Sequence, residues 1–290
     1  MAASTSTALD EGGRVFAATL AIIMALGFLT QTLGVERGTV LYRSVARWQM
    51  PNVAALAVLV AGAFVDGGGR TVLWVLSLAV VLAAMIAAGR GDWVVRSGHF
   101  AERHGLIVII ALGEVIVAIG LPVIQALEAG DGVAGRTVVA LAASGVFAAL
   151  LWWAYFDRPS PALEHRGGVI EGERDRGRYV RDVYTWAHAP IVAGIILAAA
   201  ALEEITLHPT DDLVLAFRLM FAGGILLPVV GIAAAIWRAF RKLPRERMLA
   251  ASGLAPLILL GGELDGVVLL VIVDVVLATT LVAEHVRIER

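Results

Sequence analysis

Long apolar runs, separated by short charged segments, divide this chain of 290 residues into nine predicted helices. Most runs have roughly 18 to 25 residues, the length with which an α-helix crosses about 30 Å of hydrocarbon. Alternating segments of about ten residues, which mark a membrane β-barrel, are absent. Because backbone groups in lipid must be satisfied internally, the pattern predicts an all-α polytopic bundle of transmembrane helices. The predicted spans are residues 15–34, 51–65, 71–88, 105–127, 137–156, 183–202, 213–237, 248–260 and 266–283.

Two of the nine runs are short, so the span count stays open between eight and ten. The runs over residues 51–65 and 248–260 fall below the usual length, and the second of them contains Pro256. A short or proline-bearing run can be tilted, broken or re-entrant. The alternative is therefore eight crossings with one re-entrant segment.

The first 14 residues lack the positive charge of a secretory signal peptide. They carry Asp10 and Glu11 against Arg14, and the apolar run that follows is too long for a signal sequence. We expect a disordered tail over residues 1–14 and one integral membrane domain over residues 15–290.

Positive charge is sorted between alternate loops, which predicts the orientation of the chain. Of the 23 Lys and Arg residues, all but four lie on one set of alternate loops. Three exceptions, Arg14, Arg70 and Arg136, lie on the opposite side, and Arg218 lies inside a span. Cytoplasmic loops hold the excess of positive charge. We therefore expect a bacterial inner-membrane protein with its N-terminus outside and its C-terminus inside.

Composition and motifs argue against an enzyme. The chain is 59% hydrophobic and 17% charged, whereas soluble domains are about 45–50% apolar and about 25% charged. It contains no Cys, which excludes disulfides and thiolate chemistry. Gly130, Gly132 and Gly135 spell G-x-G-x-x-G but lack the preceding strand of a dinucleotide site. We predict no catalytic residues, no cofactor and no metal, and because the basic residues follow membrane sidedness, no nucleic-acid partner.

Four polar side chains interrupt the predicted spans. Glu114 and Asp274 lie near the middle of theirs, while His188 and Arg218 lie nearer to an end. A charged residue at mid-bilayer costs about 2.5–3.5 kcal/mol on insertion scales, so each is a functional-site hypothesis.

Helical spacing groups these residues with others. Arg103 precedes Glu114 by eleven residues, or three turns, so the two share a helix face. Tyr184 lies one turn before His188. Together with Tyr155, these groups predict an interrupted polar track of the kind that proton relays use. The alternative is that Glu114 and Asp274 pair with Arg218 or with backbone groups and only hold helices in register.

The longest loop, residues 157–182, is rich in Arg and Gly and carries mixed charge. One interpretation is a segment that docks on lipid headgroups. The favoured interpretation is a flexible, positively charged connector.

Several segments resemble one family. The run His99-Phe100-Ala101-Glu102-Arg103-His104-Gly105, which continues to Gly120, resembles the signature of the bacterial low temperature requirement A family. Leu151-Trp152-Trp153 to Asp157, His188-Ala189-Pro190 to Gly194, and Glu284-His285-Val286-Arg287 add to the resemblance. The resemblance implies a multi-pass bacterial inner-membrane protein, named for growth in the cold, with no settled activity and no functional residues to transfer. The family's aromatic and acidic opening span has no counterpart here, which suggests a divergent or N-terminally shortened member.

The leading functional hypothesis is transport or permeation of a small solute or cation, coupled to protons. Glu114 and Asp274 would carry the pathway, His188 would gate it by protonation, and Arg103, Tyr184 and Arg218 complete the candidate residues. The alternative is a non-transporting membrane protein that supports envelope or cold-stress adaptation through lipid or protein contacts. The expected partners are membrane lipids, the transported solute or cation, and further copies of the chain.

Overall fold

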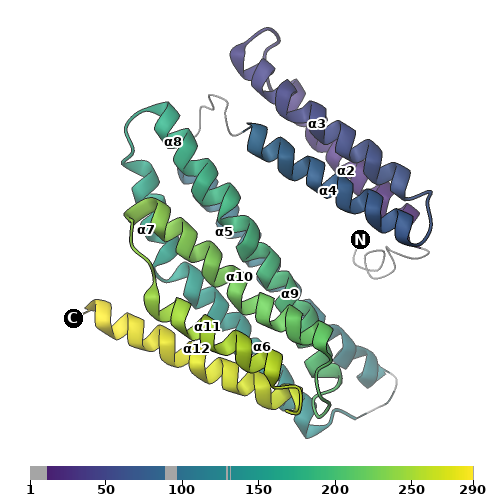
Figure 1. The fold of residues 1–290 in the computed structure, drawn as a ribbon, viewed down its shortest axis with the longest axis vertical. Coiled ribbons are helices and arrows are strands. Elements are labelled where there is room, and N and C mark those ends of the chain that lie inside the picture. The colour runs from purple at the N-terminus through teal and green to yellow at the C-terminus, as the bar shows by residue number, and fades with distance from the viewer. Residues whose placement is uncertain (1–11, 89–96, 129, 131, 290) are drawn as a thin grey trace. The chain divides into compact units, whose positions relative to one another are not determined.

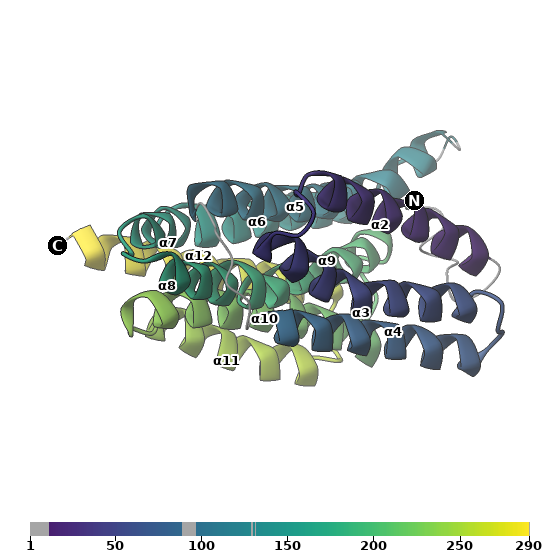
Figure 2. The ribbon, with the colours of Figure 1, turned by 90° about the horizontal axis from the view of Figure 1, so that it is seen from above.

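The computed structural model describes residues 12–88, 97–128, 130 and 132–289, and the regular structure within these ranges is helical. The chain divides into two compact units, an N-terminal unit (Met1–Val94) and a C-terminal unit (Val95–Arg290). Within each unit the long helices lie lengthwise beside one another (Figure 1; Figure 2). The all-α bundle expected from the apolar runs is confirmed.

The described part of the N-terminal unit contains three helices: α2 (Gly13–Leu33), α3 (Val40–Gly62) and α4 (Gly68–Ala88). The described part of the C-terminal unit contains nine helical elements: α5 (Ser97–Glu128), α6 (Gly135–Phe156), α7 (Pro159–Gly168), α8 (Glu173–Val180), the π-helical turn η1 (Arg181–Trp186), α9 (His188–Leu207), α10 (Leu215–Phe240), α11 (Arg245–Leu260) and α12 (Gly266–Glu289).

Seven stretches of helix in the described ranges are long and apolar enough to cross a membrane. They are Gly13–Leu33, Gly68–Met85, Gly98–Glu128, Gly135–Gly168, Glu173–Leu207, Leu215–Phe240 and Gly266–Arg287. Helices α3 and α11 are not among them: α3 is less apolar because its first half is polar, and α11 has only 16 residues. Most of the predicted tail, residues 1–11, lies outside the described residues, and α2 begins at Gly13.

Side-chain bonds to backbone carbonyls hold the N-terminal unit together. The Trp74 indole donates to the Leu59 carbonyl at 3.0 Å and the Ser77 hydroxyl donates to that of Ala55 at 2.7 Å, so two bonds join α4 to α3. Gln49 of α3 donates to the Phe28 carbonyl of α2 at 3.0 Å. The prediction placed the start of the second span at Pro51, whereas α3 begins eleven residues earlier and continues through this proline.

Contacts at the helix ends fix the directions of the helices in the C-terminal unit. Arg136 and Asp265 form an ion pair (2.5 Å) where α6 and α12 begin, and Trp153 meets His285 near their ends, so these helices run parallel. Helix α11 runs antiparallel to α12, because Arg247 near its start bonds Glu284 near the end of α12. A short turn then joins the end of α11 to the start of α12.

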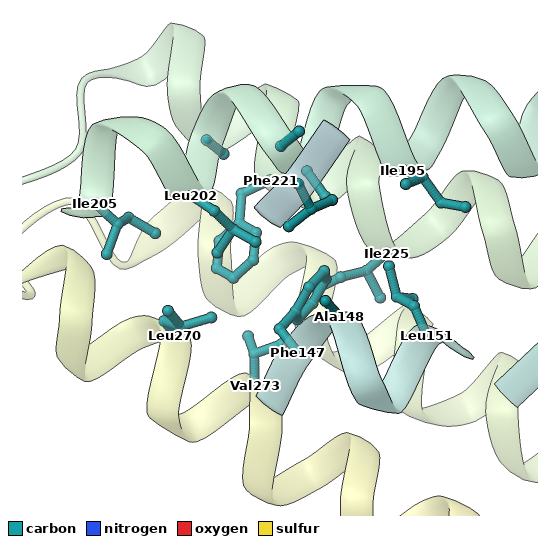
Figure 3. Packing of buried hydrophobic residues seen from close by; sticks show 14 of the residues in the cluster. Phe147, Ala148, Leu151, Ile195, Leu202, Ile205, Phe221, Ile225, Leu270 and Val273 are labelled. Atoms are coloured by element: carbon teal, nitrogen blue, oxygen red, sulfur yellow. The ribbon is translucent and has the colours of Figure 1, made fainter. Parts of the chain in front are cut away.

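Small residues allow α9 and α10 to approach each other closely. A Cβ atom added at Gly194 of α9 would lie 2.3 Å from Cδ of Pro228 on α10, and one at Gly224 would lie 2.9 Å from the Ala198 backbone. Around this contact, Phe147, Leu202, Phe221 and Val273 pack into the main apolar core (Figure 3). Van der Waals contact of this kind drives helix association where lipid surrounds the bundle.

The expectation of a flexible connector over residues 157–182 is wrong. Most of this segment folds into α7 and α8, which cover one end of the C-terminal unit. Leu163, Tyr179 and Val180 are buried there, and the Tyr179 hydroxyl donates to the Leu163 carbonyl at 2.7 Å. Because Arg and Gly dominate this segment, its few apolar residues did not indicate helices that pack on the unit.

We predict that Gly224→Ala destabilises the protein, because its new methyl group would collide with the backbone of α9. Overpacking of this kind costs about 1–3 kcal/mol. Thermal unfolding of the purified protein in detergent should show a lower midpoint. Gly145→Ala is the matched control, since a Cβ there meets nothing within 4 Å and Ala favours a helix over Gly. Equal midpoints for the two variants would refute close packing of α9 on α10.

Candidate functional site

A buried histidine, His188, lies at one end of the C-terminal unit, where α9 begins. Its side chain is 3% exposed. Its Nδ1 lies 2.8 Å from the Val183 carbonyl and its Nε2 lies 2.6 Å from the Tyr155 hydroxyl of α6. A carbonyl can only accept, so Nδ1 carries the hydrogen, and in the neutral imidazole Nε2 accepts from Tyr155. This bond ties α9 to α6.

Two further rings surround His188. His104 of α5 meets it edge-on, with ring centroids 5.1 Å apart, and the Tyr184 ring lies 5.4 Å from it. The predicted contact between Tyr184 and His188, one turn apart, is therefore present. The buried Tyr184 hydroxyl has no hydrogen-bond partner among the described residues. His104 was not among the predicted site residues, because no spacing in the sequence links α5 to α9.

The π-helical turn η1 sets the position of His188. The Ala187 N–H donates to the Asp182 carbonyl five residues earlier at 3.2 Å. The Asp182 carboxylate also binds Arg181 and, at 2.8 Å, Arg238 of α10, so the turn is anchored to a neighbouring helix. Short π-helical insertions of this kind are frequent at functional sites.

A buried ion pair lies at the same end of the unit. Arg247 of α11 and Glu284 of α12 are 2.5 Å apart, and their side chains are 7% and 12% exposed. Arg247 also donates to the Ala154 carbonyl of α6. One guanidinium thus links three helices. Neither residue was predicted as part of a site, because the sequence placed Arg247 in a loop.

A cavity of about 40 Å³ lies between these groups and is lined by residues of α5, α6, α9, α10, α11 and α12. Its wall is mostly apolar, and its polar side chains are Tyr155, Arg247 and Thr280. A water molecule needs about 10–15 Å³ of such volume and at least two polar partners. The cavity is therefore large enough for water and polar enough along one wall.

Asp274 lies deeper in the unit, on the buried face of α12. It is 7% exposed, and its Oδ1 has no hydrogen-bond partner among the described residues. Leu277 and Leu281, three and seven residues further along the same helix face, line the cavity. The carboxylate is thus about one helical turn beyond the cavity wall.

Arg218 caps the C-terminal end of α11. Its Nη1 donates to the Leu259 carbonyl at 2.6 Å, near the C-terminus of α11. Cations are favoured there by the unsatisfied carbonyls and the helix dipole. Within the described part of the chain it forms no ion pair with Glu114 or Asp274.

Glu114 and Arg103 both lie on an exposed face of α5, as their spacing predicts. Glu114 is close enough to Glu203 of α9, also exposed, for the two carboxylates to repel each other. The structure therefore brings His188, Tyr184 and Tyr155 together and places Asp274 deeper in the unit, beyond the cavity. It does not bring Glu114, Arg103 or Arg218 to this group. Among the described residues, no cluster of three or more His, Asp or Glu side chains could hold a metal ion.

We predict that Glu284→Ala destabilises the protein strongly, because it leaves Arg247 buried and unpaired. Breaking a buried ion pair costs about 3–5 kcal/mol. Glu246→Ala is the control, since the pair between Glu246 and Arg287 is largely exposed and such pairs contribute about 1 kcal/mol or less. Similar unfolding midpoints for both variants would show that the buried pair does not stabilise the helix ends.

The segments that carry the family resemblance converge on this end of the unit. His104 comes from the first, Tyr155 from the second, His188 from the third and Glu284 from the last. They meet through the ring contacts, the hydrogen bond and the ion pair described above. Segments up to 180 residues apart in sequence thus build one site.

Comparisons with known proteins agree with this resemblance. The family model described as "Bacterial low temperature requirement A protein (LtrA)" matches residues 1–282. An uncharacterized protein of Rhizobium meliloti (strain 1021) is 30% identical over 195 residues, which are 63% of this chain and 45% of that protein. The chain therefore spans less than half the length of this relative. No solved structure matches the chain. Because the family model covers nearly the whole sequence, this multi-pass helical membrane protein belongs to the bacterial low temperature requirement A family.

Proposed function

We propose that the protein is a transport or permeation protein of the bacterial cytoplasmic membrane, which moves a small cation or a small solute coupled to protons. The observation that carries the proposal is Asp274. This buried acid has an unpartnered oxygen and lies about one turn from a cavity that reaches Tyr155 and Arg247. Ionisable groups inside a membrane bundle mark ion pathways and proton relays.

The arrangement of the C-terminal unit supports nine crossings. Helices α6, α9, α10, α11 and α12 alternate in direction, as the contacts of His188 with Tyr155, Gly194 with Pro228, and Arg247 with Glu284 require. Helix α11, about 24 Å long, therefore runs from one end of the unit to the other instead of turning back.

The charges at the two ends support an N-out, C-in orientation. The end that contains α7, α8 and the loop after α10 carries most of the Arg residues of the unit. The opposite end carries Asp211, Asp212 and Asp265, and Arg136 is its basic residue. Since cytoplasmic segments hold the excess of positive charge, we propose that the His188 end faces the cytoplasm.

His188 gates the pathway in this proposal. As a neutral imidazole it accepts from Tyr155, but once protonated it donates from both nitrogens, and Tyr155 must turn its hydroxyl to accept. This reversal of donor and acceptor changes the hydrogen bond that joins α6 to α9 beside the cavity. Passage also requires movement of the core, since Phe147 and Phe221 fill the space between α6 and α10 (Figure 3).

One observation favours the non-transporting alternative. Glu114 and Glu203 lie on an exposed surface beside large apolar side chains such as Ile110 and Val117. Carboxylates on a lipid-facing surface are costly unless a partner covers them. A second copy of the chain or another membrane protein that meets this surface would give the two residues a role in assembly.

We expect ion flux into proteoliposomes that contain the protein, measured with a pH-sensitive dye under imposed proton, sodium and potassium gradients. Asp274→Asn should reduce this flux to the leak of empty liposomes, because it removes the buried carboxylate near the cavity that has no ion-pair partner among the described residues. Glu114→Gln is the control. It removes a carboxylate that lies at a similar depth in the membrane but on the exposed face of α5, so the flux should be retained. The reverse result, or no flux from folded wild-type protein, would contradict the proposal.

A further inference from the structure

Two buried polar atoms in the middle of the C-terminal unit lack partners. They are Oδ1 of Asp274 on α12 and the hydroxyl of Ser144 on α6, which is 0% exposed. A buried polar group without a hydrogen bond costs about 1–3 kcal/mol. Native structures rarely leave such groups unexplained.

The two groups lie at the same level of neighbouring parallel helices. Ser144 follows Arg136 by eight residues, and Asp274 follows Asp265 by nine, counted from the ion pair that joins the starts of α6 and α12. The ring contact between Trp153 and His285 holds the same alignment near the other end. At about 1.5 Å per residue, their levels differ by only a few ångströms. Phe147 and Val273, neighbours of the two residues on these helices, meet in the core (Figure 3).

Ser144 also differs from three threonines in helices of the same unit. The hydroxyls of Thr206, Thr279 and Thr280 each donate to the carbonyl four residues earlier. This local bond is the usual solution for a hydroxyl inside a helix. The Ser144 hydroxyl does not form it and stays available.

The two arginines that reach into the unit, Arg218 and Arg247, lie towards its ends and are already engaged. Arg218 binds the Leu259 carbonyl, and Arg247 binds Glu284 and Ala154. The described titratable groups on the elements packed against α12 lie near the helix ends. They are Arg136 and Tyr155 on α6, Arg245, Glu246 and Arg247 on α11, and His188, Glu203 and Glu204 on α9. An ionised Asp274 would therefore be a negative charge in the core without a counter-ion from the protein.

We propose that Asp274 and Ser144 form a mid-membrane binding site for a small monovalent cation, either a proton or Na⁺. The inference rests on the proposed function and names its ligand class and a second binding residue. A bound proton makes Asp274 a neutral acid, which can donate to the Ser144 hydroxyl once its side chain rotates, since the two groups form no hydrogen bond in the structure. Bound Na⁺ takes the carboxylate and hydroxyl oxygens as ligands, which are the atoms that hard cations prefer. Either cation removes the uncompensated charge.

Infrared difference spectroscopy of the full protein in lipid nanodiscs tests this site. Proton binding to Asp274 should produce a carboxylic-acid band that is absent in Asp274→Asn. Ser144→Ala should shift this band and weaken cation binding by about tenfold, the equivalent of one hydrogen bond. Thr279→Ala, which removes an exposed hydroxyl one turn away on α12, should leave band and affinity unchanged.

The two cations are distinguished by adding Na⁺ at constant pH. Loss of the acid band identifies Na⁺ as a competing ligand, whereas an unchanged band identifies a proton site. A band that persists in Asp274→Asn, or a Ser144→Ala protein identical to wild type, would overturn the inference. Because binding is measured without flux, a cation-binding protein that transports nothing would refute only the proposed function, and flux with no binding at Asp274 would refute only this site.

Discussion

A polar side chain inside a membrane bundle has to find its partner within the protein, and this requirement organises the C-terminal unit. Near the helix ends most of these groups have partners: Arg218 binds the Leu259 carbonyl of α11, Arg247 binds Glu284, and His188 binds Tyr155. Each of these contacts also joins two or more helices. The buried Tyr184 hydroxyl is an exception at this end, and in the middle of the unit Asp274 and Ser144 keep buried oxygens without a hydrogen-bond partner among the described residues. The partnered groups hold helices together, and the unpartnered pair in the middle is the basis of the proposed cation site.

The site at the His188 end depends on contacts over long distances in the sequence. The π-helical turn η1 places His188 against Tyr155 and His104, while Asp182 fastens that turn to α10 through Arg238. The close contact of α9 with α10, which Gly194 and Gly224 permit, keeps the turn in place. The small cavity lies directly beside this arrangement. A change in the protonation of His188 therefore acts on the helices that enclose the cavity.

The sequence predicted the helices well and their partners poorly. The apolar runs predicted each long helix of the described residues. The start of α3 was missed because the prediction began the span at Pro51, and α7 and α8 were missed because residues 157–182 are rich in Arg. Spacing along one helix predicted the contact of Tyr184 with His188 correctly. It could not reveal His104 or Glu284, whose partners lie on other helices. Nor could it orient Glu114, because in an apolar run the lipid-facing and core-facing sides look alike.

Transport through the C-terminal unit requires water to reach the cavity that Tyr155, Arg247 and Thr280 line. The absence of Cys from the chain permits a direct test with single cysteines in membranes. Thr280 lines the cavity, whereas its neighbour Thr279 is exposed on the outer surface of the bundle, where lipid is expected. Thr280→Cys should react with a charged, water-soluble thiol reagent, and Thr279→Cys should not. Reaction at Thr279→Cys alone, or at neither position in a folded protein, would contradict a water-accessible pathway.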